Sequence, residues 1–241
     1  MFATIDIGNT LAKLGLFKDD ELIAQFSFQN LAEMKETLTS YSIDKYIIAS
    51  VNQPYEEISL QLSLNSDQAM FLDQQTNIPF INKYKSSTLG IDRIALVAGA
   101  QSKFPQKNVL VIDAGSCITY DFITDKSAYL GGAISPGAQM RFKSMHNFTA
   151  RLPLLQLKNQ PADEWLGNTT EASMSSGVIN GIVGEMEAFI RKYQESFGPT
   201  HVLISGGDAK FFESRIKATI FAIPELLLVG LNAILRHNAS Y

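Results

Sequence analysis

The chain has 241 residues, 46% of them hydrophobic and 18% charged, which is a normal globular mixture and enough for one or two domains. The net charge of −4 and the lack of a basic stripe argue against a nucleic-acid or anionic-membrane partner. A single cysteine, Cys117, excludes an intrachain disulfide and a cysteine-based zinc site. No apolar run is long enough to span a membrane, and Met1 leads straight into a predicted strand. We therefore expect a soluble cytoplasmic protein without a signal peptide.

The first part of the chain predicts the order strand, strand, strand, helix, strand, helix, strand. The strands are expected at Phe2–Ile7, Leu11–Phe17, Leu22–Phe28, Lys45–Val51 and Ala69–Leu72, and the helices from the cap Asn30 to about Ser40 and at Glu56–Leu64. Three successive strands followed by strand–helix alternation are typical of a ribonuclease-H-like half. A further helix is predicted at Ile91–Lys103, with Pro105 just beyond it.

The second part of the chain restarts the same order. Strands are predicted at Val109–Asp113, Cys117–Ile123, Ala128–Ile134 and Val202–Ile204, and helices at Ala138–Asn147, from Thr170 to about Ser196, and at Leu226–His237. We place the boundary at Phe104–Asn108, which gives an N-terminal domain of residues 1–105 and a C-terminal domain of residues 106–241.

The two halves open with the same local pattern. Asp6-Ile7-Gly8-Asn9 and Asp113-Ala114-Gly115-Ser116 each follow an apolar run and precede a second strand, so both read strand–Asp–x–Gly–[Asn/Ser]–strand. One copy alone is explained by an ordinary Asp-Gly hairpin turn. Two copies that head two halves of one chain indicate an internal repeat with a shared function.

The chemistry of these turns favours bound phosphate. Glycine permits close approach of the backbone to a ligand, and the exposed N–H groups form an anion-binding concavity with the side chains of Asn9, Thr10 and Ser116. The carboxylates of Asp6 and Asp113 would repel phosphate unless a cation lies between them. The two turns therefore predict a metal ion, which we take to be Mg²⁺ held partly through water and phosphate oxygens.

Further glycine-rich junctions lie where strands or loops lead into predicted helices. They are Leu89–Arg93, Gly131–Gly137 and Ser205–Ala209, while Asn168-Thr169-Thr170 forms a cap for the long helix. Backbone N–H groups and the helix dipole favour anions at such places, although a glycine there is often purely structural. The sequence contains no G-x-x-x-x-G-K-[ST] motif and no G-x-G-x-x-G motif after the first strand, which excludes a P-loop kinase and leaves a Rossmann site unsupported.

These motifs together resemble the type III pantothenate kinases over nearly the whole chain. The matching segments are Asp6-Ile7-Gly8-Asn9-Thr10, Leu89-Gly90-Ile91-Asp92-Arg93, Asp113-Ala114-Gly115-Ser116, Gly131–Gly137 and Ser205-Gly206-Gly207. The resemblance implies an α/β fold of two ribonuclease-H-like domains, as in the actin/sugar-kinase/heat-shock-ATPase superfamily, with a nucleotide cleft between them. It also implies ATP-dependent phosphorylation of pantothenate to 4′-phosphopantothenate in coenzyme A biosynthesis, a homodimer, and a requirement for K⁺ or NH₄⁺.

The same resemblance implies roles for individual residues. The implied ATP contacts are Asp6, Ile7, Gly8, Asn9, Thr10, Leu11, Ala12, Lys13 and Ser116. The implied pantothenate contacts are Tyr84, Gly90, Ile91, Asp92, Arg93 and Thr170. Asp92 matches the catalytic base of the family, and Asp113 matches its monovalent-cation ligand.

The residues themselves support the role of Asp92 more weakly. Phosphoryl transfer needs a group that accepts the proton of the acceptor hydroxyl, and a carboxylate does this. Arg93 beside it could bind a substrate carboxylate in a bidentate fashion. The alternative is that Asp92 caps the helix and Arg93 pairs with it at the surface.

Two other functions stay open at this point. One is a small sugar kinase of the same superfamily, and the other is a non-catalytic regulatory protein on the same fold. For the homodimer we consider the long helix, in which Gly177, Gly181 and Gly184 share one face and Val178, Ile182, Met186 and Phe189 lie on a neighbouring face. One such face is expected to pack on its own domain and the other on a second subunit.

Overall fold

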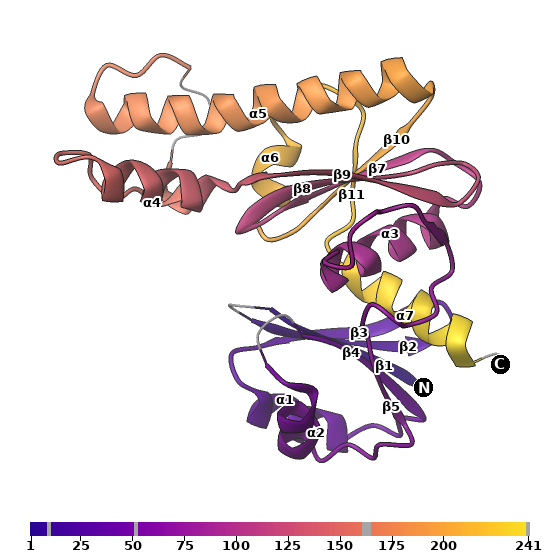
Figure 1. Cartoon of the computed structure of the whole chain (residues 1–241). Coiled ribbons are helices and arrows are strands. Elements are labelled where there is room, and N and C mark those ends of the chain that lie inside the picture. Colours follow the sequence, from indigo (N-terminus) through magenta and orange to yellow (C-terminus); the bar gives the residue numbers. More distant parts are fainter. Residues whose placement is uncertain (9–10, 51–52, 161–164, 240–241) are drawn as a thin grey trace. The chain divides into compact units, whose positions relative to one another are not determined.

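The computed structural model describes residues 1–8, 11–50, 53–160 and 165–239, and the chain divides into two compact units. Unit 1 comprises Met1–Gln106, Ile123–Leu130 and Glu225–Tyr241, and unit 2 comprises Lys107–Phe122 and Gly131–Pro224. The C-terminal helix thus belongs to the same unit as the N-terminal strands (Figure 1). The predicted domain division after residue 105 remains a prediction. In the described part of the chain, no helix has the length and apolarity needed to cross a membrane.

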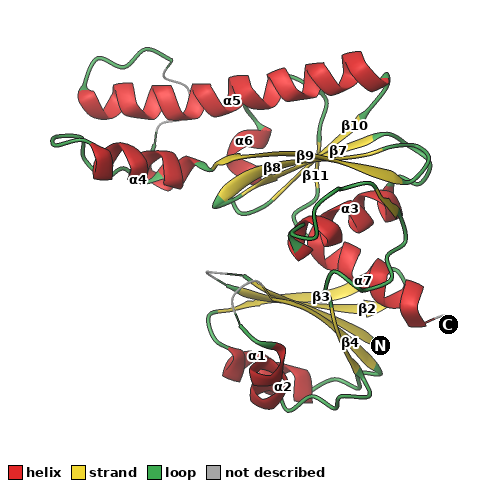
Figure 2. Ribbon diagram, in the orientation of Figure 1, coloured by secondary structure: helices red, strands yellow, loops and turns green. Residues whose placement is uncertain are grey.

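Unit 1 is built on a five-stranded sheet in the order β3-β2-β1-β4-β5. Its elements are β1 (Phe2–Ile7), β2 (Ala12–Lys18), β3 (Glu21–Phe28), α1 (Leu31–Thr39), β4 (Lys45–Ser50), α2 (Tyr55–Leu62), β5 (Ala69–Phe71), β6 (Ile81–Asn82), α3 (Ile91–Lys103) and α7 (Leu226–Ala239). Strand β1 pairs antiparallel with β2 and parallel with β4. Helices α1 and α2 cover one face of this sheet and α7 packs on the other (Figure 2). The predicted order of the first seven elements is confirmed.

The core of unit 1 follows directly from the sequence pattern. Ile5 and Ile7 of β1 are buried against Met34 of α1 and Ile58 of α2. Helix α1 begins where predicted, because the side chain of Asn30 accepts a hydrogen bond from the backbone N–H of Glu33 at 3.0 Å. Local capping and apolar spacing are therefore enough to specify this part of the fold.

Unit 2 contains most of a second sheet, ordered β11-β10-β7-β8-β9-β6. Its elements are β7 (Val109–Ala114), β8 (Cys117–Ile123), β9 (Ala128–Pro136), α4 (Ala138–Phe148), a 3₁₀ helix (Leu157–Asn159), α5 (Thr170–Phe197), β10 (His201–Ser205), α6 (Ala209–Glu213) and β11 (Phe221–Ala222); β9 begins and β8 ends in unit 1. The run β9-β8-β7-β10-β11 repeats the run β3-β2-β1-β4-β5 of the first sheet. The predicted internal repeat is thus confirmed in the topology.

The long helix α5 packs one side on its own unit. Val178, Ile182 and Met186 are buried in the core with residues of β7, β8 and β10, and the ring of Phe189 stacks on Tyr120 with centroids 4.1 Å apart. The glycines Gly177, Gly181 and Gly184 lie instead on the exposed side. One of the two faces, the apolar one, therefore packs within unit 2, as expected of one face of this helix.

Four short elements were missing from the sequence-based prediction or only implied by it. Strands β6 and β11 have two residues each, the 3₁₀ helix has three and helix α6 has five. Segments this short do not contain enough residues to show a hydrophobic period, and the strands pair with partners far away in the sequence. Strand β6, for example, pairs with Ala128 and Tyr129 of β9.

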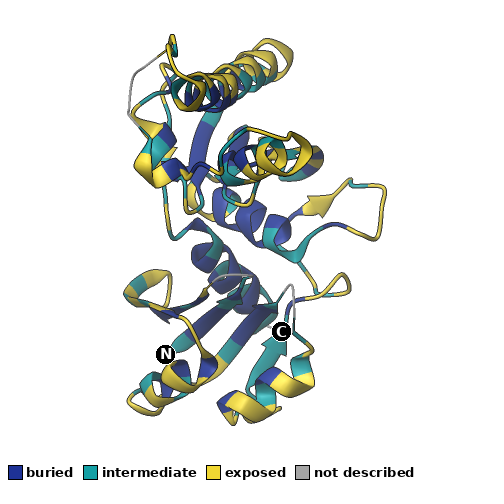
Figure 3. Cartoon of the chain, turned by 90° about the vertical axis from the view of Figure 1, so that its left-hand side faces the viewer, coloured by how far each residue is buried: buried dark blue, intermediate teal, exposed yellow. Residues whose placement is uncertain are grey.

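Helices α3 and α7 of unit 1 cross with almost no space between their backbones. A Cβ atom on Gly230 would lie 1.7 Å from the carbonyl oxygen of Ala95, and one on Gly99 would lie 2.4 Å from the carbonyl oxygen of Leu226. Residues Arg93–Ala100 of α3 are all buried, as the dark shading of this helix in Figure 3 shows. Only glycine permits this approach at either position.

We expect Gly230→Ala to lower the free energy of unfolding by about 1–3 kcal/mol, because overpacking forces the two backbones apart. Gly207→Ala is the matched control, since Gly207 is exposed, nothing lies within 4 Å of a Cβ atom there and its φ is not positive, so alanine should be neutral or stabilise by up to about 1 kcal/mol. Urea unfolding of both variants measures the difference. A stabilised Gly230→Ala protein would show that the two helices do not cross as described.

Candidate functional site

The first Asp-Gly turn connects β1, the central strand of the sheet of unit 1, with its neighbour β2. Asp6 lies opposite Lys13 in the β1–β2 ladder, so both half-buried side chains lie on one face of the sheet. The Gly8 N–H donates to the carbonyl oxygen of Leu11 at 3.1 Å. Ile7 and Ala12 are core residues that would offer a ligand only their backbone. Asn9 and Thr10, which the sequence predicts as ATP contacts, lie outside the described residues.

Asp92 lies in the first turn of α3, where the helix dipole favours a carboxylate. Gly90 is the N-cap residue, and no side chain caps this helix end. A Cβ atom on Gly90 would lie 2.3 Å from Oδ1 of Asp92, so the glycine makes room for the carboxylate. Ile91 is the first residue of the helix and is half-buried. Asp92 nevertheless makes a local hydrogen bond in this first turn, because its Oδ1 accepts from the Arg93 N–H at 2.9 Å. A structural role of Asp92 at the start of the helix, which we considered as an alternative, is therefore observed.

Arg93 is a buried residue with only 5% of its surface exposed, although the sequence left a surface position open. Its guanidinium carbon lies over the ring of Tyr84, 5.5 Å from the centroid, within the range of a cation–π contact. Tyr84 in turn stacks on Tyr129 with ring centroids 6.1 Å apart. The structure thus brings together Tyr84, Gly90, Ile91, Asp92 and Arg93 within unit 1, as the predicted pantothenate contacts require.

The carboxylate of Asp6 senses the charge of Asp92. The pKa of Asp6 is raised to about 6, mainly by burial; Lys13 lowers it, and the charge of Asp92 makes the smallest contribution, which raises it. Ionisation of both carboxylates is unfavourable in free energy, because one of them is desolvated and the two negative charges repel each other. A bound cation would compensate both charges. The geometry of unit 1 therefore suits a ligand that brings positive charge with it.

The second Asp-Gly turn is the corresponding feature of unit 2. Asp113 in β7 is half-buried and lies opposite Ser205 in β10, while Ser116 is exposed at the tip of the turn. The Gly115 N–H donates to the carbonyl oxygen of Cys117 at 2.9 Å, which closes the turn tightly. The exposed Ser116 hydroxyl is available to a ligand at this end of the strand.

Two glycines hold this second turn from neighbouring segments. A Cβ atom on Gly137 would lie 2.0 Å from the carbonyl oxygen of Gly115, and one on Gly206 would lie 2.3 Å from that of Ala114. Gly206 also has a φ of 95°, which side chains disfavour. Gly137 and Gly206 come from two of the glycine-rich junctions predicted from the sequence. Their role in the described structure is close contact with the turn.

Thr170 is the exposed first residue of α5, in unit 2. The preceding residue, Thr169, is the N-cap, and its hydroxyl accepts from the Ala172 N–H at 3.1 Å. Beside this helix end lies a hollow of about 410 Å³. Its lining residues are Leu154, Leu155, Gln156, Asn159, Gln160, Thr169, Glu171 and Ala172. Thr170 thus belongs to a different unit from the other predicted pantothenate contacts.

The described side chains do not form a complete metal cage. Among the described residues, no three His, Cys, Asp or Glu side chains gather into a metal-binding group. Mg²⁺ in phosphoryl-transfer sites commonly uses one or two carboxylates together with substrate phosphates and water. The partly desolvated carboxylate of Asp6 fits that kind of site, and a complete protein cage is unnecessary for it.

The sequence analysis did not identify several residues that hold the segments of the candidate site in place without belonging to it. The side chain of Gln74 donates to the carbonyl oxygen of Leu89, directly before Gly90. In unit 2, Arg141 and Glu185 form an ion pair at 2.6 Å. Each contact joins segments that lie far apart in the chain, so no local pattern could have shown them.

A family model described as type III pantothenate kinase matches residues 2–192. The chain is similar to a protein from Flavobacterium psychrophilum with the same description, at 42% identity over 99% of this chain and 100% of the relative. The match extends over the whole length of both proteins.

Solved structures show the same architecture. A Campylobacter jejuni protein named as a member of the Baf family of transcriptional activators is 25% identical, with a TM-score of 0.65 over 99% of this chain and 100% of its own. A glucokinase from an Antarctic psychrotroph has a TM-score of 0.53 at 12% identity over 98% of both chains, which shows the fold alone. The predicted α/β fold of the actin/sugar-kinase/heat-shock-ATPase superfamily is confirmed.

We expect Asp6→Asn to stabilise the ligand-free protein at pH 8 by on the order of 1–2 kcal/mol. The raised pKa means that the folded state binds the Asp6 proton more tightly than the unfolded state does. Wild-type stability therefore falls as the pH rises from about 4 to above 6, and the neutral amide avoids this loss. Urea unfolding at pH 4 and pH 8 measures the effect, which should nearly vanish at pH 4. An equal difference at both pH values would contradict the desolvation of Asp6.

Proposed function

Because the chain belongs to the type III pantothenate kinase family, we propose that it transfers the γ-phosphoryl group of ATP to the terminal hydroxyl group of pantothenate. The products are ADP and 4′-phosphopantothenate, and the reaction is the first step of coenzyme A biosynthesis. The observation that supports the proposal most is the cluster of Asp6, Asp92, Arg93 and Tyr84 in unit 1. We place the reaction in the cytoplasm, the compartment that supplies ATP.

On the acceptor side, we assign Asp92 as the catalytic base. The pantothenate hydroxyl oxygen attacks the γ-phosphorus, its proton passes to the Asp92 carboxylate, and the bond to the β–γ bridging oxygen breaks. Arg93 carries a buried positive charge held over Tyr84, and we assign it to the pantothenate carboxylate, since guanidinium binds such a group through two parallel hydrogen bonds. We assign further acceptor contacts to Tyr84, Gly90 and Ile91.

On the donor side, we assign the segment Asp6–Lys13 and Ser116 to the ATP phosphates. The turn N–H groups favour anions, and Lys13 adds a positive charge opposite Asp6. Mg²⁺ bound through Asp6 and the phosphates would neutralise the charge that develops on the transferred group. We assign Asp113 as the ligand of K⁺ or NH₄⁺.

We also propose that the protein is a homodimer and that Thr170 completes the pantothenate site. Thr170 lies in unit 2, whereas the other assigned pantothenate contacts lie in unit 1, so a second subunit could supply it. The exposed glycine stripe of Gly177, Gly181 and Gly184 on α5 is smooth enough for close helix approach. This stripe is the face that we assign to the interface.

The proposal is tested by ATP consumption with pantothenate, with glucose and without an acceptor, in K⁺ and in Na⁺ buffers. We expect turnover only with pantothenate and Mg²⁺, and markedly faster turnover in K⁺. Turnover with glucose would indicate a sugar kinase. No turnover with any acceptor would favour a regulatory protein, the class named for the Campylobacter jejuni structure. Equal rates in K⁺ and Na⁺ would contradict the assigned role of Asp113.

Asp92→Asn should lower kcat by about 10²–10⁴-fold and leave ATP binding close to that of the wild type, because only proton acceptance is lost. Asp67→Asn provides a control with the same chemical change at an exposed position of unit 1. Steady-state kinetics and calorimetric titration with ATP separate the two effects. Near-normal turnover of Asp92→Asn at saturating substrates would rule out Asp92 as the base.

Gly184→Glu should convert the dimer into a monomer and raise the KM for pantothenate. Nothing lies within 4 Å of a Cβ atom at Gly184, so the substitution fits within one subunit, and glutamate favours a helix more than glycine does. Gly184→Ala is the matched control without a charge, and we expect it to be fully folded. Light scattering measures the mass of the protein in solution. A fully active wild type with the mass of one chain, 26.6 kDa, would contradict the dimer proposal.

A further inference from the structure

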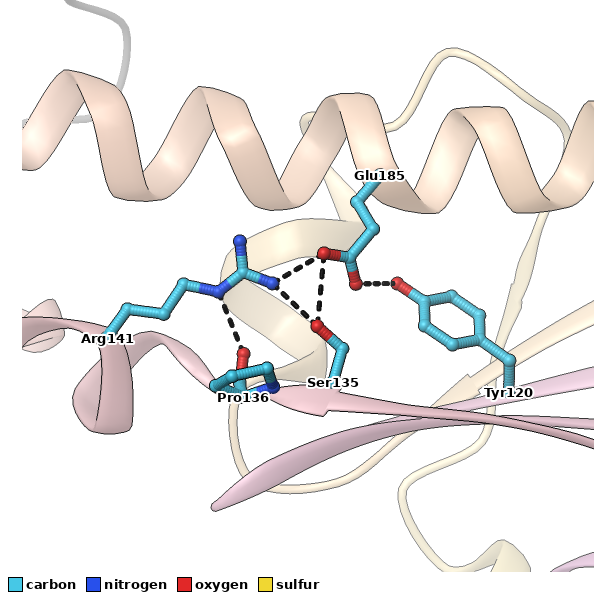
Figure 4. A network of polar contacts seen from close by, with 5 residues as sticks. All are labelled: Tyr120, Ser135, Pro136, Arg141 and Glu185. Carbon is cyan, nitrogen blue, oxygen red and sulfur yellow. Dashed lines mark hydrogen bonds and ion pairs between the residues drawn. The ribbon is translucent and has the colours of Figure 1, made fainter. Parts of the chain in front are cut away.

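A network of polar side chains lies under the middle of α5, and none of its members is assigned to a substrate. We call it the Glu185 network; its members are Tyr120, Ser135, Arg141 and Glu185 (Figure 4). The Glu185 carboxylate accepts from the Tyr120 hydroxyl at 2.8 Å, from the Ser135 hydroxyl at 3.1 Å and from Arg141 Nη2 at 2.6 Å. The network therefore joins β8, β9, α4 and α5 at one point.

The polar groups of the network are half-buried, and each of them has at least one hydrogen-bond partner within the network. Burial raises the pKa of Glu185, yet the hydrogen bonds from Arg141, Tyr120 and Ser135 outweigh burial and leave the pKa below its ordinary value. Charge-assisted hydrogen bonds of this kind have strict geometry, and they hold their partners in one arrangement. The aromatic ring of Tyr120 is fixed as well, because it stacks on Phe189.

Arg141 connects the Glu185 network to the corner between β9 and α4 through hydrogen bonds. Its Nε donates to the carbonyl oxygen of Pro136 at 2.9 Å, and its Nη2 donates to the Ser135 hydroxyl at 2.8 Å. The next residue, Gly137, donates its N–H to the carbonyl oxygen of Ser116 at 3.1 Å. The same glycine is the residue whose Cβ atom would clash with Gly115. The corner is thus in direct contact with the second Asp-Gly turn through Gly137.

We propose that the Glu185 network is a positioning element for the turn Gly115-Ser116, so that binding of ATP by this turn depends on residues that do not touch the nucleotide. The inference rests on the proposed function for the identity of the nucleotide. Rotation or displacement of the β9–α4 corner would move Gly137, and the turn would follow because no space separates them. The pantothenate contacts assigned in unit 1 belong to other segments, and Thr170 lies at the start of α5, about four turns before Glu185, so the pantothenate contacts are expected to be unaffected.

Glu185→Gln tests this inference, because the amide keeps the size of the side chain but loses the charge that Arg141 needs. We expect KM and Kd for ATP to rise by about tenfold, in the range of couplings carried by packed polar networks. The KM for pantothenate should stay unchanged. Mere loss of folded protein would lower the apparent kcat without this split between the two KM values.

Glu187→Gln is the matched control. Glu187 lies two residues further along α5 and accepts a hydrogen bond from the Lys217 N–H at 3.0 Å, so the substitution makes the same chemical change on the same helix outside the network. Its KM for ATP should equal that of the wild type. Tyr120→Phe removes one hydroxyl and keeps the stacked ring, so it provides a milder test if Glu185→Gln does not fold; we expect a smaller increase of the same kind.

Direct titration of ATP into the wild type and the variants separates this inference from the proposed function. If the wild type binds ATP but does not phosphorylate pantothenate, the proposed function fails and the Kd values for ATP still decide the inference. An unchanged Kd for ATP in both Glu185→Gln and Tyr120→Phe would overturn the inference. An equal change in Glu187→Gln, or equal changes in both KM values, would also overturn it.

Discussion

The burial of the Asp6 carboxylate governs the chemistry of unit 1. Burial is the main reason why the pKa of Asp6 is raised to about 6, Lys13 lowers this pKa, and the charge of Asp92 makes the smallest contribution, which raises it. A protein gains no stability from a desolvated carboxylate, which is the kind of group that a bound ligand completes. A nucleotide with its metal ion would bring the missing positive charge, and a substrate hydroxyl would bring the proton that Asp92 accepts.

The repeated topology explains why each of the two turns follows a strand that has a neighbour on both sides. Asp6 lies near the end of β1 and Asp113 near the end of β7, and each of these strands is paired on both sides within its sheet. A central strand is fixed by both neighbours, so the residue at its end has little freedom. Each strand therefore places a carboxylate in rigid surroundings, as a site for polyphosphate requires. The Glu185 network adds a further support behind one of these turns.

Local patterns in the sequence were enough to predict most of the fold and the short motifs of the site. Asn30 caps its helix as expected, and α3 begins and ends at the predicted residues. The contact of the Arg93 guanidinium with the ring of Tyr84 was not predictable, because it depends on a loop whose path the sequence does not specify. The Glu185 network was also hidden, since Tyr120 and Glu185 are separated by 65 positions and meet only in the folded sheet. Contacts between distant segments leave no period or spacing for a single sequence to show.

A crystal structure of the protein with a non-hydrolysable ATP analogue, Mg²⁺ and pantothenate tests the central claim most directly. The decisive quantity is the distance between the terminal hydroxyl oxygen of pantothenate and the carboxylate of Asp92. The account predicts about 2.6–3.2 Å, the range of a hydrogen bond to a general base, with the pantothenate carboxylate bound to Arg93. A hydroxyl group that points away from Asp92, or a pantothenate carboxylate held by another residue, would contradict it.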